Sequence, residues 1–511
     1  MNISFEKWGI MRKRLVSILL SFALCVYVVA CGSTKNVTNE DQVRTEEVKP
    51  KFEIEGASYI ELSDELITVN GEKVSKNEEA AVYVANDIVY YEEGKDFTYG
   101  EGSKKDEHSK EEADKHRVVH ITEPGTYVLR GSLSAGQIAV DLGKDADDDP
   151  EAVVTLALDN VDITCSVAPA VIFYNVYECG DSDKDEATKD VDTSEAGANI
   201  LIPDGTDNTI RGSYVAKIYK SVELNEAGTE VVDSKKLHKY DAALYSKMSM
   251  NISGGEENTG RLNIYAENEG LGTELHLTMN GGTVNIISGN DGINTNEEKV
   301  SVTTINDGWL NIRVDGGTGE GDGIDSNGWL VINGGVVHAA ACSTSMDAGI
   351  DSDMGIHING GMVVATGNML DHIAESEQNY VVFTFQDKIN AGEEIILKKG
   401  EESIFYSLTN DYTYLVISHE ELAEGTYTLW RGEEQLQVVE ISGGDMMPPA
   451  SLDRGKIPDE FVHEMPEGFE PGQKPGGRGG RDFGQINVED AVMEFEIKEG
   501  GNMYMVVSNR I

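Results

Sequence analysis

The stretch that decides the fold is TMNGGTVNIISGNDGINTN, residues 278–296. It contains two turn signatures, Asn-Gly-Gly and Asp-Gly-Ile, separated by a run in which aliphatic and polar residues alternate. Alternation with a period of two is typical of a β-strand that buries one face, and Asn-Gly pairs supply the positive φ angles of a tight corner. A strand flanked by two corners cannot bury its aliphatic face alone, so the stretch predicts a unit that stacks on copies of itself.

Similar units recur on both sides of this stretch. The first signature appears as NEGLGTE, NDGINTN, GDGIDSN and DAGIDSD, and its aligned glycines are Gly270, Gly292, Gly323 and Gly349. The second signature follows each copy, as TMNGGTVNI, TINDGWLNI, VINGGVVHA and HINGGMVVA. The glycines are spaced by 22, 31 and 26 residues. Periods of this size with two turn signals predict an all-β parallel solenoid, whose coils stack about 4.8 Å apart.

Changes in composition divide the rest of the chain into further predicted segments. After the solenoid, short alternating runs predict a small antiparallel β unit that caps the last coil, because an open edge would aggregate. The predicted order is a lipoprotein signal peptide at 1–31, a tether at 32–55, the parallel β-helix with acidic insertions at 56–372, the β cap at 373–444, a Pro/Gly/Met-rich linker at 445–485 and a C-terminal β hairpin at 486–511.

The leader predicts export and a lipid anchor. Basic residues at 12–14 precede an apolar run at 15–29, which is short for a membrane span, and then Ala30-Cys31-Gly32. This order resembles a bacterial lipobox, so we expect acyl chains on Cys31 to hold the protein on the outer face of the cell membrane. The alternative is an ordinary signal peptide cleaved near Ala30.

The charge of the chain excludes one class of partner. Asp and Glu number 91 against 41 Lys and Arg, which gives a formal net charge of −50. Nucleic acid is therefore not an expected partner, because phosphate binding needs a basic surface. Three cysteines follow the leader, Cys165, Cys179 and Cys342. Cys165 and Cys179 either pair in an oxidising compartment or remain buried thiols.

Acidic residues form columns when the repeats are aligned on their glycines. Carboxylates in neighbouring coils would repel by roughly 3 kcal/mol at an effective dielectric near 20. Raised pKa values, water or a bound cation must offset this repulsion, and a hard cation with six to eight oxygen ligands matches Ca²⁺. For any single residue, ordinary Asp-Gly turn chemistry is the alternative. The acidic residues of these columns include Asp291, Asp322, Asp325 and Asp351, and Asp347 flanks the last copy.

Three further side chains, Trp309, Trp329 and Arg313, are candidates for contact with a ligand. Trp309 and Trp329, and with them Tyr265, would stack on sugar rings if they face outward, although core or corner packing is the more common role of such residues. Arg313 alternates with Ile312 and Val314, so it should face outward, where it would pair with a uronate or with a nearby aspartate.

Five segments outside the turn signatures, together with the coils, carry a family resemblance. They are ITEPGTYVLRGSLSAGQIAV from Ile121, LALDNVDIT from Leu156, ILIPDGTDNTI from Ile200, AALYSKMSMNISGG from Ala242 and ISHEELAEGTYTLWRG from Ile417. They resemble the clostridial-type carbohydrate-binding β-helix lipoproteins, whose fold is similar to pectate-type polysaccharide lyases. The resemblance implies a right-handed parallel β-helix and binding of plant polysaccharides such as polygalacturonate and cellulose. It also implies bound calcium, with ligands at Asp291, Asp322, Asp325, Asp347 and Asp351. The chain departs from the pattern at Glu269, Gly272 and Ala348.

The sequence therefore favours a non-catalytic, cell-surface polysaccharide-binding protein that uses calcium. A calcium-dependent lyase is the first alternative, but it needs a Lys or Arg base, and the repeat region has few beyond Arg261, Lys299 and Arg313. A structural adhesin that binds another protein is the second.

Overall fold

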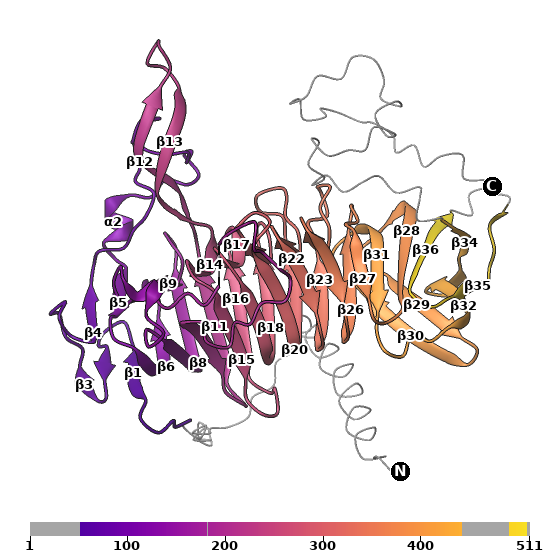
Figure 1. The fold of residues 1–511 in the computed structure, drawn as a ribbon, viewed down its shortest axis with the longest axis horizontal. Helices are drawn as coiled ribbons and strands as arrows, with labels where there is room; N and C mark the ends of the chain where they lie inside the picture. Colours follow the sequence, from indigo (N-terminus) through magenta and orange to yellow (C-terminus); the bar gives the residue numbers. More distant parts are fainter. Residues whose placement is uncertain (1–51, 181, 442–489, 508–511) are drawn as a thin grey trace, which may run out of the picture. The chain divides into compact units, whose positions relative to one another are not determined.

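The computed structural model describes residues 52–180, 182–441 and 490–507. The predicted signal peptide with Cys31, most of the predicted tether and the predicted Pro/Gly/Met-rich linker lie outside these residues. In the described part, helix is limited to α2, Lys110–Ala113, and a 3-10 turn at Ala146–Asp148, and the other elements are β-strands (Figure 1). No helix there is both long and apolar enough to cross a membrane. The protein is all-β, with many parallel strands.

One sheet has nine strands that follow one another in strict chain order. All neighbours pair in parallel except β4 and β5, which are antiparallel. Parallel pairing of consecutive strands means that the chain returns to the same face once per coil, as a solenoid requires. The strands are β4 Val82–Ala85, β5 Arg117–Ile121, β7 Gly136–Asp141, β9 Val171–Asn175, β14 Ala242–Ser246, β17 Glu269–Thr273, β19 Ile293–Thr295, β21 Ile324–Ser326 and β24 Ile350–Ser352.

The other strands of each coil belong to a twenty-stranded sheet, and four of the twenty strands come from the C-terminal unit described below. The pairing register of this sheet shifts at the Asn-Gly-Gly corner. Strands β18 and β20 run through this corner, whereas later coils divide there into two strands each. The bounds are β1 Ser58–Leu62, β6 Gly125–Leu133, β8 Val154–Cys165, β10 Ala198–Ile202, β11 Asp207–Gly212, β15 Met250–Gly254, β16 Arg261–Ala266, β18 Leu277–Ser288, β20 Val302–Val314, β22 Trp329–Ile332, β23 Val336–Ala340, β25 Gly355–Ile358, β26 Met362–Gly367 and β27 Ile373–Ser376, with β2 Thr68–Val69 and β3 Glu72–Lys73 as a small antiparallel extension of β1.

The core is built of aliphatic columns, one residue from each coil. Ile264, Ile286, Ile312, Ala339 and Ala365 are Cα partners in successive strands, and all are buried. Because every coil contributes one such residue, the alternation in the sequence becomes a continuous apolar interior along the stack.

Glycine is required in the two turn signatures for different physical reasons. At Gly292 an added Cβ would lie 2.2 Å from Ile312 Cγ2 and 2.5 Å from the Gly323 carbonyl oxygen, so the next coil leaves no room for a side chain. At the Asn-Gly-Gly corner the second glycine has positive φ, +74° at Gly335, which L side chains rarely adopt.

A long antiparallel hairpin interrupts the stack. Strands β12, Val215–Leu224, and β13, Val231–Tyr240, form their own two-stranded sheet and project from the coils (Figure 1). This hairpin was not predicted. It buries no continuous apolar face: Val232 is 62% exposed and Leu237 is 49% exposed.

The C-terminal unit covers the end of the solenoid. Strand β31, Tyr412–Ser418, pairs antiparallel with β26 of the last coil and with β28, Tyr380–Ile389. Since β27 still pairs in parallel with β25, the last coil extends to Ser376, beyond the predicted boundary at 372. The remaining strands are β29 Glu394–Lys399, β30 Glu402–Ser407, β32 Gly425–Arg431, β33 Glu434–Gln435 and β34 Gln437–Glu440.

The last two strands do not form the hairpin expected at the C-terminus. Strand β36, Gly501–Val507, instead pairs in parallel with β28 and antiparallel with β34. Strand β35, Phe495–Ile497, pairs with β32. Tyr504 and Phe495 join Phe383 in an aromatic cluster, so packing against the cap determines where these strands lie.

Candidate functional site

The predicted aspartates lie on neighbouring coils of the nine-stranded sheet. Asn294, Asp325 and Asp351 are Cα partners at the centres of β19, β21 and β24. Each lies between two buried residues that point inward, so its own side chain is on the outer face. The structure therefore forms one acidic column from positions that are about 30 residues apart in the sequence.

A second column lies in the turn that precedes these strands. The backbone N–H of Asp322 donates to Asp291 Oδ1 at 2.7 Å, and the N–H of Ala348 donates to Asp322 Oδ1 at 2.6 Å. Asp347 Oδ2 accepts from the N–H of Gly321 at 2.6 Å. Each carboxylate thus accepts a hydrogen bond from an amide of the following or preceding coil, and links neighbouring coils.

Burial makes these carboxyl groups unusually hard to ionise. It raises the pKa of Asp291 to about 7, with further contributions from Asp347 and Asp351. Burial, with Asp291 next, raises the pKa of Asp325 to about 7. It raises the pKa of Asp322 well above its usual range, reinforced by the carboxylates of Asp351 and Asp291.

Asp371 extends the columns and was not found from the sequence. Burial, then Asp371 and Asp325, raise the pKa of Asp351 to about 8. Asp371 Oδ2 accepts a hydrogen bond from the N–H of Ser352 at 3.0 Å. It lies after the last Asp-Gly-Ile copy, without the glycine that marks the other positions, so alignment of the repeats could not include it.

Glu269 continues the acidic column toward the N-terminus. The Asn294 amide donates to Glu269 Oε1 at 3.0 Å, whereas Oε2 is buried and has no hydrogen-bond partner within the described chain. Burial and then the carboxylates of Asp241 and Asp291 raise the pKa of Glu269 well above its usual range. The residue that departs from the repeat pattern is therefore part of the same acidic cluster.

The donor chemistry of the columns suits a hard cation, because carboxylate, amide and turn carbonyl oxygens are the ligands that Ca²⁺ prefers. The unpartnered Oε2 of Glu269 and the raised pKa values show that the cluster is short of compensating positive charge. However, among the described residues no three His, Cys, Asp or Glu side chains converge into a group that could hold a metal ion. The residues fit calcium in chemistry, and any ion would also need amide and carbonyl oxygens.

The three predicted ligand-contact residues are divided between two faces. Trp309 and Arg313 are both half-buried on β20, on the outer side of the strand, while Leu310, Ile312 and Val314 point inward. Trp329 lies on β22, beyond the Asn-Gly-Gly corner, where its Cα partners are Val302 and Gly355. The structure thus places Trp309 and Arg313 on the same face of β20, four residues apart, and Trp329 on the adjoining face.

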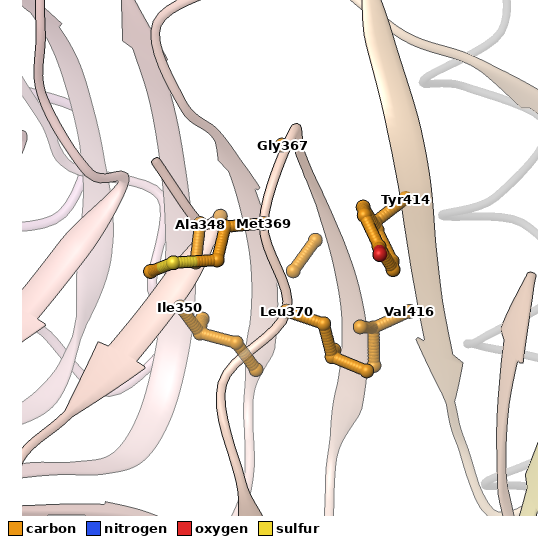
Figure 2. Close-up of a pocket in the computed structure, with 9 residues that line it drawn as sticks. Ala348, Ile350, Gly367, Met369, Leu370, Tyr414 and Val416 are labelled. Atoms are coloured by element: carbon orange, nitrogen blue, oxygen red, sulfur yellow. The ribbon is translucent and has the colours of Figure 1, made fainter. Parts of the chain in front are cut away.

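The cavity in Figure 2 is apolar and very small. It lies between the last coil and the cap, with Ile350 from β24 and Tyr414 and Val416 from β31 in its wall. Its volume of about 10 Å³ is close to the least that holds one water molecule. This cavity is too small for a sugar ring.

The cysteines of the described chain are free thiols. Cys165 and Cys342 are buried, and Cys179 is half-buried. Burial raises the pKa of Cys165 to about 12, so this thiol is inert at neutral pH. Of the two alternatives for Cys165 and Cys179, the structure has the unpaired one.

Comparison with known proteins identifies the family. A model of the carbohydrate-binding domain-containing proteins matches residues 115–411, more than half of the chain, and the chain belongs to this family. A carbohydrate-binding domain-containing protein of Acetivibrio thermocellus is 29% identical over 171 residues, 33% of this chain and 45% of the relative. The match thus spans less than half of that relative's length.

Among solved structures, the polysaccharide lyase-like protein from C. thermocellum, solved as a gadolinium derivative, is 17% identical to this chain. The match has a TM-score of 0.32 and covers 63% of this chain and 93% of that one.

Proposed function

We propose that this protein is a non-catalytic polysaccharide-binding protein of the cell surface, and that calcium neutralises its aspartate columns. The proposed ligands are acidic plant polysaccharides such as polygalacturonate, cellulose, or both. The observation that carries the proposal is the stack of Asp291, Asp322, Asp325 and Asp351 with raised pKa values, in a chain of a carbohydrate-binding family.

Calcium would serve both the fold and the ligand. An ion held by carboxylates from successive coils removes their repulsion, and its open coordination positions accept a uronate carboxylate. We assign Asp291, Asp322, Asp325, Asp347 and Asp351 as the side chains that would coordinate calcium. Asn294 and Glu269 are candidates for additional oxygen donors.

Binding is favoured over lyase chemistry by the surroundings of the columns. A lyase needs a Lys or Arg base beside the calcium-bound uronate. The strongest electrostatic influences on Asp322, Asp325 and Asp351 come from other carboxylates, which favour holding cations. We also infer a right-handed winding, because parallel crossover connections are nearly always right-handed.

We further propose that acyl chains on Cys31 hold the protein on the outer face of the cell membrane. Changing Cys31 to Ser should move the protein from the membrane fraction to the soluble fraction. A variant that remains in the membrane fraction would contradict the lipid anchor.

Calorimetry with polygalacturonate and with cellulose oligomers, in calcium and in a chelator, tests the function. We expect binding in calcium and a weaker interaction with polygalacturonate after chelation. Equal affinity in both conditions would rule out bridging by calcium, and ultraviolet absorbance from an unsaturated product would show that the protein is a lyase. The double variant D322N/D325N should lose the calcium effect, whereas Asp315→Asn, at an exposed turn, should keep it.

A further inference from the structure

The outer face of β16 displays an arginine, an asparagine and a tyrosine in order. Arg261, Asn263 and Tyr265 point outward, while Leu262 and Ile264 between them are completely buried. Arg261 is exposed, and 42% of the surface of Tyr265 is exposed. An arginine and an aromatic ring thus flank an amide on a flat, open strand.

Strand β20, two coils further along, repeats this display in the opposite order. Trp309, Asn311 and Arg313 point outward. Through the intervening strand β18, Trp309 is in register with Arg261, and Arg313 is in register with Tyr265. Two coil spacings separate the strands by about 10 Å. We call these six residues and Asn285 of β18 between them the Arg–Asn–aromatic face.

An amide ladder fixes the centre of this face. Asn311 donates to Asn285 Oδ1 at 3.0 Å, and Asn285 donates to Asn263 Oδ1 at 2.9 Å. Each amide has two N–H donors and two acceptor lone pairs, so Asn285 and Asn311 keep capacity for a ligand. Because the ladder already holds the amides in place, a hydroxylated ligand would meet them without further ordering.

The two arginines of the face are free to bind an anion. In a chain with 91 acidic residues, neither Arg261 nor Arg313 forms a salt bridge to a residue that the structure describes. Next to the face, Arg211 lies over the Tyr265 ring at 5.2 Å and pairs with Asp162 at 2.6 Å, in an ion pair that is exposed on both sides. Guanidinium groups bind carboxylates in a bidentate manner, so these two arginines can hold an anion although the whole chain is acidic. Asp207, the Cα partner of Arg261 in β11, accepts a hydrogen bond from Asn263 at 2.9 Å.

We propose that the Arg–Asn–aromatic face binds a uronic-acid polymer directly, without a bridging cation. Arg261 and Arg313 hold carboxylates of the polymer, Tyr265 and Trp309 lie against its sugar rings, and the asparagines bind its hydroxyls. This inference rests on the proposed function, since it assumes a polysaccharide ligand. It differs in placing an ion-independent site on the face that adjoins the aspartate columns.

The test measures binding of the full chain to polygalacturonate in a chelator, with a neutral polysaccharide, cellulose oligomers, in parallel. In R261Q/R313Q we expect the affinity for polygalacturonate to fall by about tenfold or more, because charge-assisted hydrogen bonds are lost. Binding of the neutral polymer should change little. The control K220Q/K235Q removes two exposed lysines from the β12–β13 hairpin and the same amount of charge, and should bind like the wild type.

The outcomes separate this inference from the proposed function. If the wild type binds polygalacturonate only in calcium, or if R261Q/R313Q binds as the wild type does in chelator, the direct site is wrong and the calcium-dependent function stands. An equal loss of affinity in K220Q/K235Q would also overturn the site, because the loss would then come from the change in net charge and not from these two arginines. A wild type that binds neither polymer in either condition removes both proposals. Unchanged melting temperatures would show that the variants fold.

Discussion

Asp291 and Asp322 occupy equivalent turns of neighbouring coils, and the backbone N–H of Asp322 donates to Asp291 Oδ1 at 2.7 Å. That hydrogen bond favours the ionised form of Asp291, yet burial outweighs it and raises the pKa of Asp291 to about 7. The Asp291 carboxyl therefore accepts a backbone hydrogen bond, but within the described chain it lacks a positive charge that would offset the cost of burying its ionised form. This conflict determines how the fold should respond to pH, to calcium and to substitution.

Stability without metal should fall as the pH rises. In the unfolded chain an aspartate ionises near pH 4. In the folded protein the pKa is about 7 for Asp291 and Asp325 and about 8 for Asp351. The folded state thus binds more protons between these values, so the stabilisation from protonation is complete below about pH 4 and is lost as the pH rises through about 8.

Thermal unfolding in a chelator at pH 5 and at pH 8 measures this effect. We expect a lower melting temperature at pH 8, and we expect calcium to reduce the difference because it stabilises the ionised form. A melting temperature that is the same or higher at pH 8 in chelator would show that the columns do not carry the excess charge.

Replacing Asp322 by Asn should stabilise the metal-free protein and weaken its response to calcium. The amide oxygen of Asn can still accept the hydrogen bond from the N–H of Ala348, while one buried carboxylate is removed. At pH 8 we expect the melting temperature in chelator to rise by a few degrees and the shift on adding calcium to shrink. Asp315→Asn is the control, because Asp315 is exposed and its Oδ1 also accepts a backbone hydrogen bond, from Gly317. Equal changes in the two variants would argue against the columns.

Gly292→Ala should destabilise the fold. The added Cβ would lie 2.2 Å from Ile312 Cγ2 and 2.5 Å from the Gly323 oxygen, so neighbouring coils must separate. Overpacking of this kind costs about 1–3 kcal/mol in the free energy of unfolding. Urea denaturation measures it, with Gly317→Ala as the control because its nearest atom would be at 3.4 Å. If the two variants are equally stable, close approach is not the reason for the aligned glycines.

The coils and the aspartate columns could be predicted because each coil repeats the same physical constraint. The aligned glycines mark where successive coils approach, and the residues at fixed offsets from them, such as Asp325 and Asp351, must fall in register. Asp371 and the β12–β13 hairpin were not predicted, because neither is part of the sequence repeat. The pairing of β36 with β28 depends on aromatic packing between segments more than 100 residues apart, which local alternation does not encode.

The Arg–Asn–aromatic face could not be predicted from the sequence for a different reason. The sequence indicated Tyr265, Trp309 and Arg313 one at a time, but their register with one another and with Arg261 depends on the length of each coil. The coils here differ in length because the loops at their corners differ, so only the pairing of β16, β18 and β20 reveals which residues are neighbours.

The Asn-Gly-Gly corners should stabilise the stack through their asparagines. Asn306 donates to Asn280 Oδ1 at 2.8 Å, Asn333 to Asn306 Oδ1 at 2.8 Å, and Asn359 to Asn333 Oδ1 at 2.7 Å. Asn333 therefore takes part in two links of this ladder and Asn359 in one. Each hydrogen bond contributes about 0.5–1.5 kcal/mol, with the lower end expected at an exposed site.

Asn333→Ala should therefore lower the free energy of unfolding by about 1–2 kcal/mol, and Asn359→Ala by about half as much. Urea denaturation of both variants under the same conditions gives the ratio. The double variant N333A/N359A shares one link between its two sites, so its loss should be smaller than the sum of the single losses. Equal losses in the single variants with full additivity in the double variant would mean that the amides act separately, through their own turns, and not as a ladder along the coils.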